Sequence, residues 1–245
     1  MKKAMVLSGL LLPVLFGSVS VAQTAAASGD SETLKLAALT EPVKKYSVHK
    51  IPKNMTVAEK KERFKQLLLP PVRKVYRELN GLYSLVKSNI ETGNRKGVDE
   101  LKAVYEVETD QELLMALKPH PISIVLAQAA MESSWATSRF IREGNNAFGV
   151  WSYDPSEPRM AAGETRGKKT VWVKKYKSLE DSVRDNYMLL AKSKAYREFR
   201  QLRMQTSDPH ALVKKLHRYS EIGAKYGSEL SSIIRYNAFD QHDLG

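Results

Sequence analysis

The segment LAQAAMESSWATSRFIREGNNAFGV, residues 126–150, places one carboxylate, Glu132, at the end of an apolar run. Residues 122–131 are almost all apolar or small, which predicts a helix buried on all sides. The C-terminal end of a helix carries about half a negative charge, and burial strips a carboxylate of its hydration. Because both effects raise a carboxyl pKa, Glu132 is expected to keep a proton near neutral pH and to act as a general acid. An exposed or ion-paired glutamate is the alternative.

Amides and aromatic rings surround Glu132 in the sequence. The residue four positions earlier is expected on the same helix face, and the tryptophan three positions later is expected to supply an apolar wall. The run EGNNAFGVW then adds a turn with two amides and two aromatic rings. Such groups suit a neutral sugar, so the candidate substrate-binding residues are Gln128, Ser133, Trp135, Asn145, Asn146, Phe148 and Trp151. Core packing is the alternative for the aromatic residues.

Helices are expected on both sides of this segment. Thr56 and Glu59 have capping-box spacing, and Pro70-Pro71 is expected to end that helix and begin a second one that stops near Gly93. A short helix is expected near 98–107, and another after Thr109 or Asp110. The later helical patterns cover residues 178–192, 193–202, 208–219 and 227–236.

The helical sequence pattern is interrupted between Val150 and Lys177. TVWVKKY has the β-branched and aromatic content of a strand, and AAGETRGKK resembles a hairpin tip, with Gly163 and Gly167 on either side of ETR. The pattern therefore predicts a mainly α-helical protein of the α+β type, with a helical core and a small β-hairpin lobe beside the active-site cleft.

The N-terminus has the features of a secretory signal peptide. Two lysines precede an apolar run that ends in the small-x-small sequence Ser20-Val21-Ala22. A retained membrane anchor is the alternative, and no later stretch is apolar enough to span a bilayer. The expected organisation is a signal peptide, a flexible tether, a helical N-terminal extension and a catalytic domain, at residues 1–22, 23–54, 55–108 and 109–240.

Composition narrows the cofactors and partners. The chain has no cysteine, which excludes disulfides and thiolate zinc sites, and its five histidines are scattered, so a metal site is not expected. The net charge of +12 favours an anionic partner, which by charge alone is a cell-wall polymer, a membrane surface or nucleic acid. A nucleic-acid partner is not expected, because the sequence shows neither a recognised basic helix nor an aromatic sheet motif.

Several motifs carry a family resemblance. LAQAAMESSWATS and NNAFGVW resemble the glucosaminidase domain of glycoside hydrolase family 73, especially its exported Bax-like branch. YKSLEDSVRDNYMLL and HRYSEIGAKYGSELSSIIRYN are similar to two further family segments in the same order. The resemblance covers roughly residues 109–240. It implies a lysozyme-like fold and cleavage of β-1,4 bonds between the N-acetylated sugars of peptidoglycan, without a cofactor, in the periplasm or cell envelope.

The resemblance also implies roles for individual residues. By similarity, Glu132 is the general acid, and the family places a second carboxylate in the β-lobe. Glu164 is the best match by position, with Asp154 and Glu157 as alternatives. Tyr219 matches a family tyrosine that would stabilise charge on the sugar ring or orient its acetamido group. Tyr226, a further substrate-binding candidate, follows after a longer gap than the family pattern has, which leaves its role open.

Two alternative functions share this fold. A lytic transglycosylase also has Glu-Ser at a helix end, but a Gly-Leu-Met-Gln type stretch usually follows, and the Asn-Asn-Ala-Phe-Gly found here favours the hydrolase. A non-catalytic cell-wall-binding module is the other alternative. The lysines of the β-lobe are expected either to draw in an anionic glycan or to form a solvated face; they are Lys168, Lys169, Lys174, Lys175 and Lys177.

Overall fold

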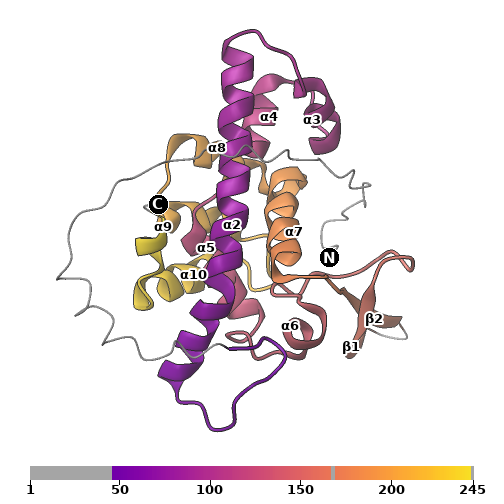
Figure 1. Ribbon diagram of the computed structural model, residues 1–245, viewed down its shortest axis with the longest axis vertical. Helices are drawn as coiled ribbons and strands as arrows, with labels where there is room; N and C mark the ends of the chain where they lie inside the picture. The colour runs from indigo at the N-terminus through magenta and orange to yellow at the C-terminus, as the bar shows by residue number, and fades with distance from the viewer. Residues whose placement is uncertain (1–45, 167–168, 244–245) are drawn as a thin grey trace, which may run out of the picture. The chain divides into compact units, whose positions relative to one another are not determined.

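The computed structural model describes residues 46–166 and 169–243, so the expected signal peptide and most of the expected tether lie outside the described residues. The described part is mainly helical and contains one two-stranded sheet (Figure 1), as the sequence predicts. Its elements, in chain order, are α2 (Val57–Glu91), α3 (Val98–Tyr105), α4 (Asp110–Leu117), α5 (Ile122–Glu132), α6 (Arg139–Gly144), β1 (Arg159–Arg166), β2 (Lys169–Lys174), α7 (Leu179–Lys192), η1 (Lys194–Tyr196), α8 (Arg197–Gln205), α9 (Pro209–Leu212), η2 (Val213–Leu216), α10 (Ala224–Tyr236) and η3 (Phe239–His242).

Helix α2 is longer than the sequence suggests. Its start is as predicted, with a capping box between Thr56 and Glu59. The predicted break at Pro70-Pro71 is wrong, because the helix runs through both prolines to Glu91. Prolines remove two backbone donors, but the residues around them are held in the main core: Leu68 and Val72 are fully buried. Tertiary packing thus outweighs the local preference for a break.

Helix α5 lies in the middle of the main core and carries Glu132 at its end. Its residues 122–130 are all buried, as the apolar pattern predicts, and it packs against α2, α10 and η3. Its N-terminal cap comes from far away in the sequence, since the Asp243 carboxylate accepts hydrogen bonds from the Ser123 backbone N–H (2.8 Å) and hydroxyl (2.6 Å). Among residues 46–166 and 169–243, no single helix is long and apolar enough to cross a membrane, and α4 and α5 meet that test only as a pair bent by 59°.

The N-terminal helices contribute to two apolar clusters. The first half of α2 supplies Phe64, Leu68, Val72 and Val75 to the main core around α5. The second half of α2, which α3 and α4 flank in Figure 1, closes a smaller cluster against α7. The members of that cluster are Val86, Val98, Tyr105, Leu113, Ala116, Leu117 and Ala191. The helical extension and the helices after residue 109 therefore share their cores.

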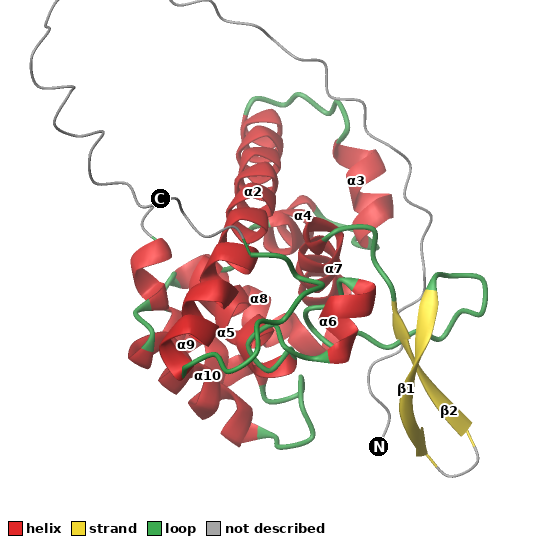
Figure 2. Cartoon of the chain, turned by 60° about the horizontal axis from the view of Figure 1, so that its bottom comes forward, coloured by secondary structure: helices red, strands yellow, loops and turns green. Residues whose placement is uncertain are grey.

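The two strands form an antiparallel hairpin that projects from the helices beside α6 (Figure 2). Met160 pairs with Val173 and Arg166 pairs with Lys169, with an irregularity between Ala161 and Thr165. Gly163 lies in this irregular stretch at a φ of 86°, a conformation that favours glycine. The lobe is therefore as predicted, and the end of the hairpin falls within AAGETRGKK, where Arg166 of β1 pairs with Lys169 of β2. Glu-Thr-Arg itself belongs to β1.

Candidate active site

Glu132 is the last residue of α5 and is partly exposed, whereas the nine residues before Met131 are buried. A left-handed turn follows it, with φ values of 52°, 63° and 60° at Ser134, Trp135 and Ala136. Three consecutive non-glycine residues in this region are strained and need outside support. Part of it comes from Ser133, whose buried hydroxyl donates to the Ala129 carbonyl and accepts from the Ala136 N–H (2.8 Å).

Further support for the turn comes from α2. Arg63 is fully buried there, and its Nη1 donates to the Ala136 carbonyl at 2.8 Å. Its Nη2 donates to the carbonyls of Ser47 (2.8 Å) and Val48 (3.2 Å). One guanidinium thus ties the segment before α2 to the turn after Glu132. The sequence analysis missed Arg63, whose position in a run of charged helical residues is typical of a solvated face.

The turn also decides where Trp135 points. Its ring packs edge-on against Phe64, with 5.2 Å between ring centroids, and lies 6.2 Å from Phe239. The Lys61 ammonium stands over the same ring at 5.2 Å. A wall beside Glu132 would require Trp135 to lie on the same helix, but α5 ends at Glu132, so Trp135 joins α2 and the C-terminal η3 instead.

A buried series of hydrogen bonds ends on Glu132. The Tyr219 hydroxyl donates to Asn186 Oδ1 (3.1 Å), and Asn186 Nδ2 donates to Gln128 Oε1 (3.4 Å). Gln128 Nε2 donates to the Tyr226 hydroxyl (3.3 Å), which in turn donates to Glu132 Oε1 (3.0 Å). Gln128, Asn186 and Tyr226 are fully buried. We call these five residues the Glu132 network; it joins α5, α7 and α10.

The tyrosines of this network stay protonated. The rings of Tyr219 and Tyr226 stack, with centroids 5.2 Å apart and planes 12° from parallel, and Tyr196 lies 6.2 Å from Tyr219. Burial raises the pKa of Tyr219 and of Tyr226 well above the ordinary value, and the negative charge of Glu132 adds to both shifts. Burial and the same charge raise the pKa of Tyr196 to about 12. The phenols therefore act as neutral hydrogen-bonding groups.

The position of Tyr226 depends on the glycine beside it. A Cβ atom on Gly227 would lie 2.6 Å from the Val213 carbonyl oxygen, so only glycine allows α10 to approach η2 this closely. This close approach brings the Tyr226 hydroxyl to Glu132. The sequence singled out Tyr219, yet it is Tyr226 whose hydroxyl contacts the carboxylate, and Tyr219 reaches Glu132 through the network.

The two asparagines of the NNAFGVW motif hold the β-lobe. Asn145 is left-handed (φ 50°), and its amide donates to the carbonyls of Tyr176 and Lys177 at 3.1 and 3.2 Å. Asn146 donates to the carbonyls of Val150 (3.0 Å) and Lys174 (2.9 Å), and its Oδ1 accepts the N–H groups of Val150 (3.0 Å) and Phe148 (3.4 Å). Phe148 itself lies in the main core. The motif thus joins the lobe to the helices.

An aromatic pair lies where the lobe leaves the helices. Trp151 is partly exposed and bridges Val173 of β2. Its ring centroid lies 6.2 Å from that of Tyr153, which is 57% exposed. The sequence analysis did not select Tyr153, although its alternation with Trp151 was a usable signal.

The carboxylates considered as partners of Glu132 have different surroundings. Glu164 lies in β1, and its side chain is outside the described part of the structure. Asp154 accepts hydrogen bonds from the Ser156 N–H (2.8 Å) and hydroxyl (2.7 Å), which lower its pKa. Glu157 forms an ion pair at 3.5 Å with Lys174.

The lysines expected in the β-lobe also differ in their surroundings. Lys174 also pairs with Asp185 at 3.4 Å, so two carboxylates hold its ammonium group. Lys175 and Lys177 are exposed, whereas the side chains of Lys168 and Lys169 fall outside the described part. Within residues 46–166 and 169–243, no group of three or more His, Cys, Asp or Glu side chains could hold a metal ion.

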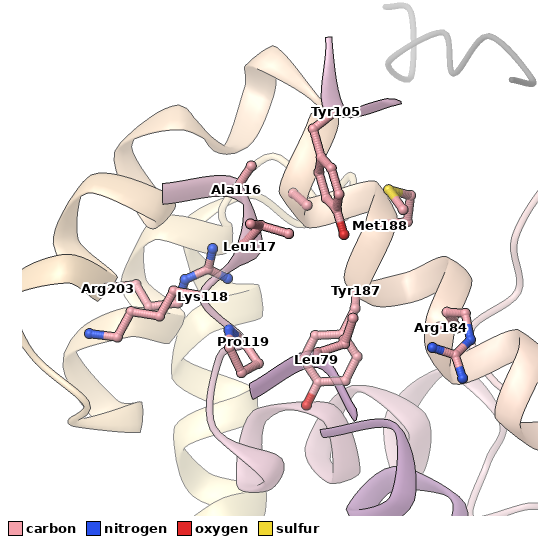
Figure 3. Close-up of a pocket in the computed structure, with 11 residues that line it drawn as sticks. Leu79, Tyr105, Ala116, Leu117, Lys118, Pro119, Arg184, Tyr187, Met188 and Arg203 are labelled. Carbon is pink, nitrogen blue, oxygen red and sulfur yellow. The ribbon is translucent and has the colours of Figure 1, made fainter. Parts of the chain in front are cut away.

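A small cavity of about 20 Å³ lies away from the Glu132 network, between the second half of α2, the residues after α4, and helices α7 and α8 (Figure 3). Arg203 lines it; this residue is buried and donates to the Met115 carbonyl at 2.6 Å. Burial lowers the pKa of Arg203 to about 9. The other lining residues are Leu79, Tyr105, Ala116, Leu117, Lys118, Pro119, Arg184, Tyr187, Met188 and Ala191, none of which belongs to the network.

His120 makes the protein sensitive to acid. It is fully buried between Tyr187 and Phe199, and burial, together with the charge of Arg203, lowers its pKa well below 6.5. As the pH falls below 6.5, His120 binds a proton in the unfolded chain but stays neutral in the folded protein. The free energy of unfolding therefore falls by about 1.4 kcal/mol per pH unit. We expect His120→Phe to remove this slope between pH 6.5 and 5 in urea unfolding, and His217→Asn, at an exposed histidine, to retain it. Equal slopes in the two variants would refute this role.

The chain is similar to several known proteins. A glucosaminidase family model, described as mannosyl-glycoprotein endo-beta-N-acetylglucosaminidase, matches residues 111–239. Protein bax of Escherichia coli (strain K12) is 30% identical over 123 residues, a match that spans 48% of this chain and only 43% of the relative. The catalytic domain of the autolysin Auto from Listeria monocytogenes has a TM-score of 0.46 and 19% identity, covering 86% of this chain and 94% of that one. A peptidoglycan hydrolase from Sphingomonas sp. A1 has a TM-score of 0.42 and 24% identity, with coverages of 54% and 86%.

Proposed function

Because the chain belongs to the glucosaminidase family of glycoside hydrolases, we propose that it is an exported peptidoglycan hydrolase, an endo-β-N-acetylglucosaminidase with Glu132 as general acid. Its substrate is the β-1,4 bond of the N-acetylglucosamine/N-acetylmuramic acid strand. One observation carries the proposal. Glu132 ends the core helix α5 with its side chain partly exposed, and its Oε1 accepts a hydrogen bond from the buried Tyr226. Export rests on the composition of residues 1–22.

In the proposed reaction, the Glu132 carboxyl gives its proton to the bridging oxygen as the bond from that oxygen to the sugar C1 breaks, and a water molecule supplies the oxygen that finally bonds to C1. The hydrogen bond from Tyr226 to Oε1 strengthens as the carboxylate forms, because bonds to an ionised acceptor are stronger than neutral ones. The left-handed turn and Arg63 fix the C-terminal end of α5, which carries this carboxyl.

The second carboxylate of the proposal is Glu164, with Asp154 and Glu157 as alternatives. Carboxyl groups about 5 Å apart give retention, and a separation of about 6.5–9.5 Å gives inversion. If the acetamido oxygen of the substrate assists, the second carboxylate orients that group. Asp154 and Glu157 are engaged by Ser156 and Lys174, and Glu164 is chosen by its position in the β-lobe.

The β-lobe provides the proposed contacts with the glycan. The exposed ring of Tyr153 and its neighbour Trp151 offer aromatic faces for a sugar ring. Lys175 and Lys177 are exposed cations close by in sequence, suited to the carboxylates of peptide stems and lactyl groups. Four other candidates form hydrogen bonds within the protein and act by holding the elements around the site in place; they are Asn145, Asn146, Gln128 and Ser133.

The products of purified sacculi test the proposal. We expect new reducing ends at N-acetylglucosamine, identified by borohydride reduction and mass spectrometry of the released fragments. Reducing ends at N-acetylmuramic acid would instead define a muramidase, and 1,6-anhydro ends a lytic transglycosylase. Binding to sacculi without release of either kind of end would identify a wall-binding module.

A further inference from the structure

The direction of the hydrogen bonds in the Glu132 network is set by its two amides. Each phenol can donate and accept, so Tyr219 and Tyr226 fit either direction. An amide oxygen only accepts and an amide nitrogen only donates, so the orientations of Asn186 and Gln128 determine which way every other bond points. As observed, all donors point toward Glu132, from Tyr219 at one end to Tyr226 at the other.

The opposite direction would take the Tyr226 donor away from Glu132. If the Gln128 amide turned over, its oxygen would face Tyr226, and the Tyr226 hydroxyl could then donate to Gln128. Glu132 Oε1 would then lose a charge-assisted hydrogen bond. What prevents this turn is Asn186 Nδ2, which donates to Gln128 Oε1 and so keeps the Gln128 nitrogen directed at Tyr226.

Asn186 is also engaged on its other side. The Tyr219 hydroxyl donates to its Oδ1 at 3.1 Å, while Nδ2 faces Gln128. Asn186 is fully buried on α7, and within the Glu132 network its side chain bonds to Gln128 and Tyr219. A buried amide with both ends engaged is costly to rotate, because either end would be left without a partner.

We propose that Asn186 is a positioning residue, which fixes the amide of Gln128 and thereby makes Tyr226 a hydrogen-bond donor to Glu132. It acts on the reaction through two intermediate side chains and touches neither substrate nor the reacting atoms. The proposal deepens the proposed function, because it concerns the carboxyl group assigned as general acid.

The charge environment of Glu132 allows this effect to be measured. The charge of Glu132 acts on the phenols of Tyr196 from η1, Tyr219 from the segment before α10, and Tyr226 from α10. Asp185 of α7 acts on Tyr219 and accepts a hydrogen bond from Tyr176 at 2.6 Å. Since the phenols remain neutral at ordinary pH, a change in the titration of Glu132 reports the loss of the Tyr226 donor.

Asn186→Leu tests the proposal, since leucine has a similar volume and no polar atom. We expect the titration midpoint of the Glu132 carboxyl, followed by ¹³C NMR and assigned with Glu132→Gln, to rise by about one pH unit. We also expect kcat for sacculi to fall about tenfold with KM little changed, and the alkaline limb of the pH profile, where the general acid loses its proton, to move to higher pH with the carboxyl. Tyr219→Phe removes the hydroxyl that bonds to Asn186 and keeps the ring stacked on Tyr226. It should raise the titration midpoint of Glu132 by a smaller amount, and it replaces Asn186→Leu as the test if the leucine variant does not fold.

The matched control is Val183→Ala, a buried position one turn earlier on α7. It weakens the packing of the same helix and leaves the network intact, so the Glu132 midpoint should not move. An unchanged midpoint in both Asn186→Leu and Tyr219→Phe, with activity lowered only as much as in Val183→Ala, would overturn the proposal. A shifted midpoint in a protein that releases no glycan fragments, even as wild type, would uphold the positioning role and refute the proposed function.

Discussion

Glu132→Gln is expected to lower the rate of glycan release from sacculi by about three orders of magnitude while the protein stays folded. The amide has nearly the same shape, and its oxygen can still accept the hydrogen bond of Tyr226. It has no acidic proton to give to the bridging oxygen, so bond breaking loses its acid. The measurement is the rate of appearance of reducing ends, with unfolding in urea as the check on the fold.

The control for this variant is Glu143→Gln. Glu143 lies in α6 a short distance along the sequence, and its side chain is 49% exposed and paired with Arg139. Removal of this charge should leave the rate within about twofold of wild type, because exposed ion pairs contribute little. Equal rates in the Glu132 and Glu143 variants would show that the general acid is another residue.

Arg63→Met is expected to cost about 3 kcal/mol of the free energy of unfolding, the largest stability effect that we predict. Methionine replaces the aliphatic stem, but the carbonyls of Ala136, Ser47 and Val48 lose the guanidinium that binds them. The left-handed turn after Glu132 then lacks its outside support. We therefore expect the variant to lose activity at temperatures where it is still folded, because the end of α5 is less well held.

Urea unfolding and sacculus hydrolysis measure the two effects on the same samples. Arg77→Met, an exposed arginine later in α2, is the matched control and should change stability by less than about 0.5 kcal/mol. An Arg63→Met variant as stable and as active as the Arg77→Met variant would contradict the role given to the Arg63 hydrogen bonds.

Local signals in the sequence predicted much of the fold. The cap predicted at Thr56 and the one predicted at Thr109 or Asp110 are found at Thr56 and Thr109, since a cap depends on side chains within three residues of it. The apolar run before Glu132 predicted a buried helix that ends at this residue, and the structure has that helix. The strand character of TVWVKKY likewise predicted β2.

Predictions failed where distant packing opposed a local preference. Pro70-Pro71 disfavours a continuous helix, but the burial of Leu68 and Val72 on either side holds α2 together. Trp135 stands three residues after Glu132, and the left-handed turn directs it to Phe64 of α2. In both cases, residues remote in the sequence supply the deciding energy.

The sequence by itself determined that this protein is a glucosaminidase-family chain with one carboxylate at the end of a buried helix. Only the tertiary structure decided what holds that carboxylate. Tyr226 lies 94 positions from Glu132, Asn186 lies 58 from Gln128, and Arg63 lies 73 from Ala136. Periodicity and capping act over one or two helical turns, whereas a buried hydrogen bond forms between whichever polar groups the packed helices bring together, so these partners become known only once the chain is folded.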